Sequence, residues 1–123
     1  MNRQRLFVIS LLSVIHSGCG DTVTSNYATY ADAEKDNLFD RGWLPDILPV
    51  STANIRTKNS LDDNASRGSF EIPKPDIDVF KSKLRRLDNG QYAFSYGEIM
   101  KDPTWVFSVD ENEKQVSYVL SSN

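Results

Sequence analysis

The spacing of apolar side chains predicts one well-formed helix in the second half of the chain. Four apolar residues lie three or four positions apart: Ile77, Phe80, Leu84 and Leu87. This period places them on one helix face, which can be buried against another element. Asp76 stands at the expected N-cap, and Asn89-Gly90 ends the pattern. We therefore expect a helix from Asp76 to about Leu87.

A shorter helix is predicted near residue 30. Thr29 and Asp32 have the spacing of an N-cap residue and an acidic residue three positions later, so we expect a helix from there to about Phe39. Gly42 follows at a position suited to the left-handed conformation that ends many helices. The preceding residues 20–26 are small and polar, which is typical of a flexible tether.

Alternating apolar and polar residues predict five strands: 55–61, 66–72, 91–96, 104–109 and 115–120. Turn-forming Asp62-Asp63-Asn64 separates the first two, and a charged segment joins the last two. The resulting order of helices and strands predicts an α+β fold. We expect a small single domain, with an antiparallel sheet of about five strands and two helices packed on one face.

Residues 1–19 have the plan of a secretory signal peptide, with a basic head, a ten-residue apolar run and an exit of small residues. The run is too short for a membrane span, which takes about 20 residues. Ser17-Gly18-Cys19 resembles the cleavage box of bacterial lipoproteins, although His16 stands where an aliphatic residue is usual. The resemblance implies a lipoprotein signal peptide at 1–18 and lipidation of Cys19. Plain secretion and an uncleaved anchor are the alternatives.

These assignments divide the chain into a signal peptide at 1–18, a lipidated Cys19 with its tether at 19–27, and one domain at 28–123. In enterobacterial lipoproteins, Asp directly after the lipidated cysteine favours the inner membrane. Here Gly20 follows Cys19. The resemblance therefore implies an envelope protein on the periplasmic side, anchored by lipid, with the outer membrane preferred.

Charge argues against a nucleic-acid partner. Cleavage before Cys19 removes two arginines, which leaves 12 basic residues against 17 acidic ones and a net charge near −5. Such a balance disfavours nucleic acid and general attraction to anionic lipid. A local basic cluster alternates with the apolar helix stripe and is interpreted as a solvated helix face: Lys81, Lys83, Arg85 and Arg86.

The scarcity of histidine and cysteine excludes several catalytic mechanisms and metal sites. The only histidine, His16, leaves with the signal peptide, and the only cysteine, Cys19, carries the anchor. Ser-His-Asp and Cys-His catalysis, zinc sites built from these residues and structural disulfides are then excluded. We expect no cofactor and no metal. Enzyme mechanisms that need only carboxylates, Lys, Ser or Tyr stay open, such as that of a glycosidase-like carboxylate pair. The candidate carboxylates are Asp62, Asp63, Glu71 and Glu98.

An apolar, proline-rich segment follows the first helix. Its two prolines, four positions apart, exclude a regular helix or a central strand. We expect an irregular stretch whose Trp43 and Leu44 lie in the core. The alternative is an exposed loop that binds a partner. The residues concerned are Trp43, Leu44, Pro45, Leu48 and Pro49.

The same segment carries a family resemblance. Residues 41–49 read Arg-Gly-Trp-Leu-Pro-Asp-Ile-Leu-Pro and are followed by Ser-Thr-Ala-Asn-Ile and later by Leu-Asp-Asp-Asn. This pattern is similar to a group of uncharacterised bacterial proteins, often predicted lipoproteins. The sequence departs from it at Thr52, where Ala is usual, and at Ser60, where Asp is expected. The resemblance implies no activity.

Three functions are compatible with the sequence. The first is a lipid-anchored envelope protein that serves as a binding or structural module, with an envelope protein as partner. The second is an inhibitor or immunity protein against an envelope hydrolase or toxin, since negative charge steers binding to basic enzymes. The third is an enzyme that uses only carboxylates.

Overall fold

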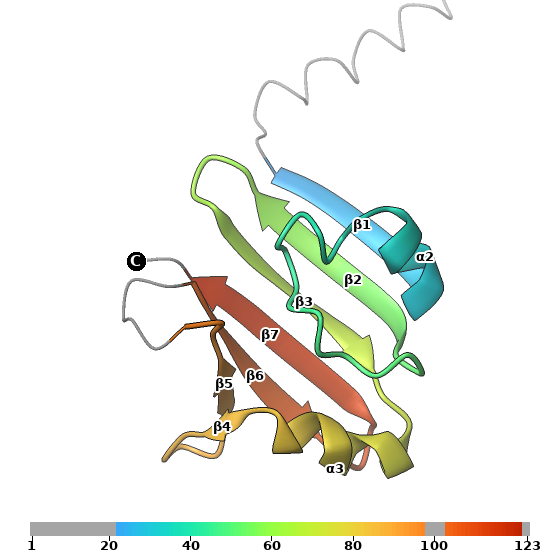
Figure 1. The fold of residues 1–123 in the computed structure, drawn as a ribbon, viewed down its shortest axis with the longest axis vertical. Helices are drawn as coiled ribbons and strands as arrows, with labels where there is room; N and C mark the ends of the chain where they lie inside the picture. The colour runs from blue at the N-terminus through green and yellow to red at the C-terminus, as the bar shows by residue number, and fades with distance from the viewer. Residues whose placement is uncertain (1–21, 98–102, 122–123) are drawn as a thin grey trace, which may run out of the picture.

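Seven strands form one antiparallel sheet, accompanied by two short helices (Figure 1). The structure is a computed structural model that describes residues 22–97 and 103–121. The strand order is β1-β2-β3-β7-β6-β5-β4. The elements are β1 (Thr22–Thr29), α2 (Tyr30–Lys35), β2 (Ala53–Ser60), β3 (Ala65–Glu71), α3 (Lys74–Ser82), β4 (Arg85–Arg86), β5 (Tyr92–Phe94), β6 (Thr104–Asp110) and β7 (Gln115–Ser121).

The chain is therefore a small, mostly-β domain, and the expected α+β fold with about five strands is corrected. All five predicted strands are present, as β2, β3, β5, β6 and β7. Two further strands, β1 and β4, extend the sheet at its two edges. The helices have only 6 and 9 residues. In the described part of the chain, neither helix has the length or apolar character needed to span a membrane.

Strand β1 was not predicted from the sequence. A tether was expected over 19–27, but residues 22–27 belong to a strand of eight residues, which pairs with β2 from Thr22 opposite Ser60 to Thr29 opposite Ala53. Tyr27 is the only buried side chain of β1, so the alternation that normally reveals a strand is absent. The predicted signal peptide at 1–18 and Cys19 lie outside the described residues.

Both helices are shorter than predicted. In α2, the Thr29 side chain accepts a hydrogen bond from the Asp32 N–H at 3.1 Å, which confirms the predicted cap. The helix ends at Lys35, and Asn37 then adopts a φ of 59°. Such left-handed backbone cannot continue a helix. The prediction that α2 reaches Phe39 is therefore wrong.

Helix α3 begins two residues before the predicted cap. Pro73 precedes its first turn, and Asp76 lies inside that turn, where its carboxylate accepts a hydrogen bond from Ser51 Oγ at 2.6 Å. The helix ends at Ser82 because the chain then joins the sheet as β4. Of the predicted stripe, Ile77 and Phe80 are buried, whereas Leu84 and Leu87 lie beyond the helix and are half-buried.

One face of the sheet carries the core. The rings of Phe70, Phe80 and Phe107 meet edge to face, with centroids 5.3 to 6.3 Å apart. Because Phe80 comes from α3 and the other two from β3 and β6, these contacts hold the helix against the sheet. The segment between α2 and β2 also crosses this face (Figure 1) and adds Leu38 and Leu44 to the core.

A small polar cluster is buried beside the aromatic core. Ser66 Oγ donates a hydrogen bond to Asn59 Oδ1 at 2.6 Å and lies 3.0 Å from Tyr118 Oη. Burial raises the pKa of Tyr118 to about 12, and the contact with Ser66 opposes this shift. Nearby on β2, Thr57 is also buried, but its hydroxyl has no hydrogen-bond partner among the described residues.

Candidate functional site

The proline-rich segment at 43–49, predicted either as core or as a binding surface, has some side chains that are buried and some that are only half-buried. Leu44, Pro45 and Leu48 are buried, whereas Trp43 and Pro49 are only half-buried. The expectation that Trp43 lies in the core is therefore met only in part. Its ring packs against the core from the outside, and Leu44 fills the interior.

Hydrogen bonds hold this segment to β6, to the residues that follow β5 and to α2. The Trp105 indole N–H donates to Trp43 O at 3.0 Å, and the Asp46 N–H donates to the Tyr96 hydroxyl at 3.0 Å. The Tyr30 hydroxyl donates to Asp46 Oδ1 at 2.9 Å. Burial, followed by the hydrogen bond to Asp46, raises the pKa of Tyr30 to about 12. The segment is thus a fixed cover over the core.

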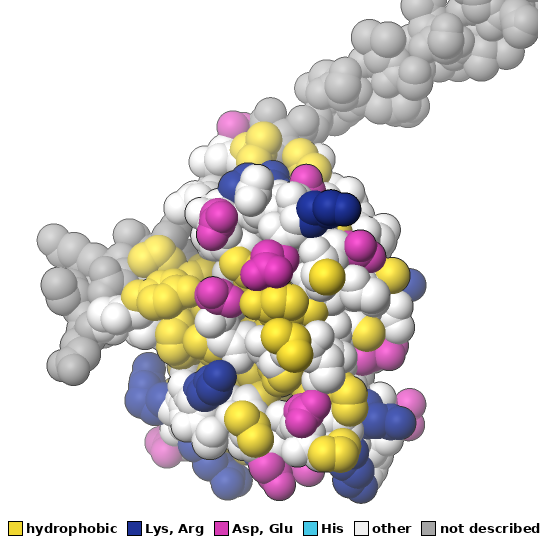
Figure 2. All heavy atoms as spheres, turned by 45° about the vertical axis from the view of Figure 1, so that its right-hand side comes forward, with side chains coloured by type: hydrophobic (Ala, Val, Ile, Leu, Met, Phe, Trp, Pro, Cys, Tyr) yellow, Lys and Arg dark blue, Asp and Glu magenta, His cyan; other side chains and the backbone are white. Residues whose placement is uncertain are grey.

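Aromatic side chains surround this cover. Tyr96 is 68% exposed, and its ring contacts Phe94 and Trp105 at centroid distances of 5.1 and 5.9 Å. Tyr30 stacks on Phe39 at 4.9 Å. Figure 2 shows hydrophobic side chains gathered in the middle of one face, with acidic side chains among them. Because these rings contact one another, their packing accounts for the aromatic cluster, and no bound ligand is needed to explain it.

The candidate carboxylates do not assemble into a catalytic pair. Asp62 and Asp63 lie in the turn before β3, whereas Glu71 ends β3. The extended strand from Ala65 to Glu71 places this turn about 20 Å from Glu71, which exceeds the roughly 5–10 Å of a glycosidase pair. Glu98 lies outside the described residues. Within residues 22–97 and 103–121, no group of three or more His, Cys, Asp or Glu could hold a metal ion.

The opposite face of the sheet carries the clearest unexplained feature. Arg56 and Lys58 alternate with buried residues along β2, so both are on this face, and both are exposed. Arg67 of β3 is also exposed and lies directly opposite Lys58. Arg56 pairs with Ser69 one step further along β3. We call Arg56, Lys58 and Arg67 the basic face.

Electrostatics make this placement unfavourable for the isolated domain. Like charges directly opposite on neighbouring strands destabilise a sheet, and no described carboxylate forms an ion pair with any of the three cations. Other cations do have partners, since Arg41 contacts Asp36 and Lys81 contacts Glu111. The three cations therefore have no described carboxylate in ion-pair contact, on a protein whose net charge is negative. The nearest acidic residue on this face is Glu71, which lines the same depression as Arg56.

The side chains around the basic face are small, and some of them are apolar. Ser69, Ser117 and Ser108 continue the row that starts at Arg56. Val119 is 54% exposed and lies directly opposite Arg67. Together with neighbouring residues, these side chains line one broad open depression. Arginine and lysine beside hydroxyls and an exposed valine suit an anionic partner with some apolar surface.

A glycine permits the close strand pairing beneath the basic face. A Cβ at Gly68 would lie 1.9 Å from Arg56 O and 3.0 Å from the Tyr118 ring. No other residue fits there without a backbone shift. Gly68 therefore fixes the approach of β2 to β3, on which the spacing of the three cations depends.

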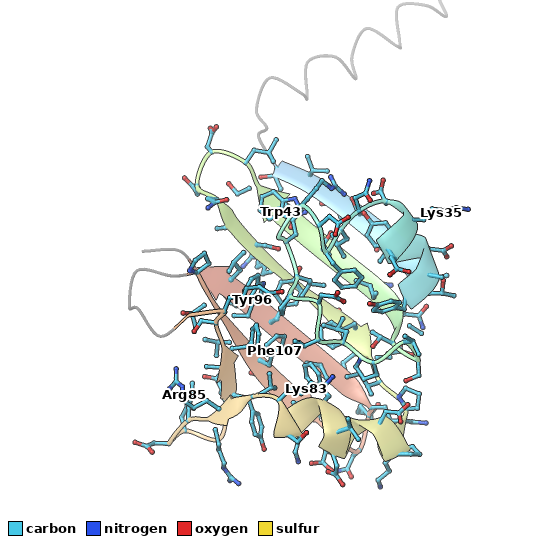
Figure 3. The ribbon with its side chains drawn as sticks, viewed as in Figure 1. Lys35, Trp43, Lys83, Arg85, Tyr96 and Phe107 are labelled. Atoms are coloured by element: carbon cyan, nitrogen blue, oxygen red, sulfur yellow. The ribbon has the colours of Figure 1, made fainter. Side chains whose placement is uncertain are left out.

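The basic cluster predicted on a helix face is corrected. Lys81 belongs to α3, where it contacts Glu111 and lies 5.7 Å from the Tyr92 ring centroid. Lys83 follows the end of α3, and Arg85 and Arg86 form the edge strand β4 (Figure 3). The basic face itself was missed, although the alternation of Arg56 and Lys58 with Ile55 and Thr57 could have placed both cations on one side.

Residues 21–71 match the YbbD head domain. The matched range contains β1, α2, β2 and β3, and also the proline-rich segment at 43–49, which we call the Trp43 segment. It thus contains all three residues of the basic face. It leaves α3 and β4 to β7 outside. Neither curated proteins nor solved structures gave a match to the chain.

Proposed function

We propose that this chain is a lipid-anchored binding module of the bacterial cell envelope, which binds an acidic envelope protein on its basic face. One observation carries the proposal: Arg56, Lys58 and Arg67 are adjacent on an uncovered sheet face and have no described ion-pair partner. A partner's carboxylates would supply the missing countercharges.

The composition of the face favours a protein over a purely ionic ligand. Val119 is 54% exposed beside Arg67, and Val106 lies on the next strand opposite it. Interfaces between proteins combine such apolar area with arginine and a polar surround. The face is also open, as a surface that receives another folded domain must be.

The proposed anchor would hold the domain close to the membrane. The signal-peptide plan and the lipoprotein-like box support lipidation of Cys19 on the periplasmic side, with the outer membrane preferred. The described strand β1 begins at Thr22, so three peptide units separate it from Cys19. They span at most about 11 Å. Cys19→Ser should release the protein from membranes or leave it as an uncleaved precursor.

Co-purification from envelopes tests the binding function. The tagged full chain is compared with a variant carrying Arg56→Ser, Lys58→Ser and Arg67→Ser. A control variant loses three exposed lysines elsewhere, through Lys35→Ser, Lys74→Ser and Lys83→Ser. We expect one acidic protein to accompany the wild type and the control, to be lost with the basic-face variant, and to dissociate as salt rises. Equal recovery with both variants would contradict the proposal.

A further inference from the structure

The two edges of the sheet differ in how they are protected. The edge strand β4 has two residues, both arginine, and short charged edges resist pairing with another chain. The opposite edge, β1, has eight residues with the sequence Thr-Val-Thr-Ser-Asn-Tyr-Ala-Thr. It contains no charge and no proline, and it pairs regularly with β2 from Thr22 to Tyr27. It therefore lacks the usual devices that block strand addition.

The outer side of β1 is accessible in the described structure. Of its side chains, only Tyr27 is buried, and Thr22, Val23 and Thr24 are all exposed. Alternate residues of an edge strand direct their main-chain N–H and C=O groups away from the sheet. Figure 1 shows β1 as the outermost strand on its side of the sheet. The strand can therefore accept a further antiparallel strand.

We infer that β1 pairs with β1 of a second copy, which forms a twofold dimer with one continuous sheet. In this pairing, Ser25 of one copy lies opposite Ser25 of the other. The numbers of any two paired residues then differ by an even number, so the core-facing sides of the two sheets lie on the same side of the dimer. It sets Val23, which is 46% exposed, opposite Tyr27 of the second copy. Such β-branched and aromatic cross-strand pairs are stabilising.

A second copy suits this edge for two further reasons. Identical strands that carried charge would oppose like charges across the axis, and β1 carries none. The arginines of β4 block the other edge, so the association closes at two copies and does not grow into a fibre. The inference does not depend on the proposed partner of the basic face.

Disulfide crosslinking of the full chain in envelopes tests the dimer. Ser25 lies on the proposed axis, where opposite Cα atoms are about 4.5–5.5 Å apart, within the range that a disulfide spans. Ser25→Cys should give a disulfide-linked dimer of twice the chain's mass under mild oxidation. The wild type, whose only cysteine is Cys19, is the background control.

A second variant separates pairing from folding. Thr24→Glu and Asn26→Glu place acids opposite Lys58 and Arg56 within one copy, which favours the folded chain. In the dimer they place glutamates opposite each other, so the Ser25→Cys crosslink should fall at least about tenfold. A control adds the same charge away from β1, at the exposed Val50 and Val79. With Val50→Glu and Val79→Glu, the crosslink should remain.

Three results would overturn the dimer. One is the absence of a crosslink from Ser25→Cys in protein that accumulates and resists protease like the wild type. Another is a crosslink that persists unchanged with Thr24→Glu and Asn26→Glu. The third is a crosslinked species that contains a different protein, which would assign the β1 edge to a foreign strand.

Discussion

Lys58 of β2 and Arg67 of β3 are directly opposite partners in the antiparallel register, on a face that no described element covers. Because both side chains are exposed and carry the same charge, they cost the isolated domain stability. A bound molecule that supplied the countercharge would remove this cost. The relationship between these two residues is therefore the basis of the proposed function.

Removing the repulsion should stabilise the domain. Lys58→Glu creates an opposite-charge pair with Arg67 and should raise the free energy of unfolding by about 0.5 kcal/mol, the scale of an exposed pair. Lys58→Ser, which removes the repulsion without adding attraction, should fall between Lys58→Glu and the wild type. Urea unfolding of the three proteins gives the order. A wild type more stable than both variants would contradict the inference that Lys58 and Arg67 repel each other.

The Trp43 segment should contribute to stability chiefly through Leu44. Leu44→Ala removes a fully buried side chain and should cost about 3 kcal/mol. Trp43→Ala removes a half-buried ring and should cost less, about 2 kcal/mol. Thermal unfolding measures both changes. The reverse order, with Trp43 more costly than Leu44, would show that the indole ring is the principal core anchor.

Two buried threonines provide a matched test of hydrogen bonding. Thr57 Oγ1 has no described partner, so Thr57→Val should raise stability by about 1 kcal/mol. Thr52 is equally buried, but its hydroxyl donates to Pro49 O at 2.6 Å. Thr52→Val should therefore lower stability by about 1 kcal/mol. Denaturant midpoints distinguish the two, and a loss of stability in both variants would refute the assignment at Thr57.

Alkaline pH should destabilise the fold through Tyr118. Burial raises the pKa of this tyrosine to about 12 in the folded state, whereas the unfolded value is about 10. The unfolded chain then releases the proton first, so the contribution to stability is complete below pH 10 and is lost between about pH 10 and 12. Tyr118→Phe should make this part of the stability–pH profile less steep, and the raised pKa of Tyr30 leaves a smaller slope in the same range. A profile as steep as that of the wild type would exclude Tyr118 as a main cause.

The hydrophobic pattern predicted the central strands well because their side chains alternate between core and solvent. It failed at β1, where only Tyr27 is buried and the remaining residues are exposed. It also extended α3 to Leu87, since Leu84 and Leu87 keep a helical spacing although the chain has already turned into β4. Apolar spacing alone does not determine where a helix stops when the following residues also pack on the core.

The basic face could be predicted only in part. Arg56 and Lys58 alternate with Ile55 and Thr57, which assigns both cations to the solvent side of one strand. Placing Arg67 opposite Lys58 requires the register of the β2–β3 hairpin. That register includes an irregularity between Ala53 and Arg56 and a glycine at 68 without room for a side chain, and no sequence spacing reveals either feature.

Site-specific photocrosslinking in living cells tests the basic face most directly. A photoreactive residue at Val119 lies beside Arg67, and a matched probe at Val79 has the same 54% exposure on α3. We predict that the probe at position 119 captures an acidic envelope protein, that the probe at position 79 does not, and that Arg56→Ser, Lys58→Ser and Arg67→Ser together abolish the capture. Capture of the same protein from both positions, or capture that survives loss of the three cations, would contradict the account.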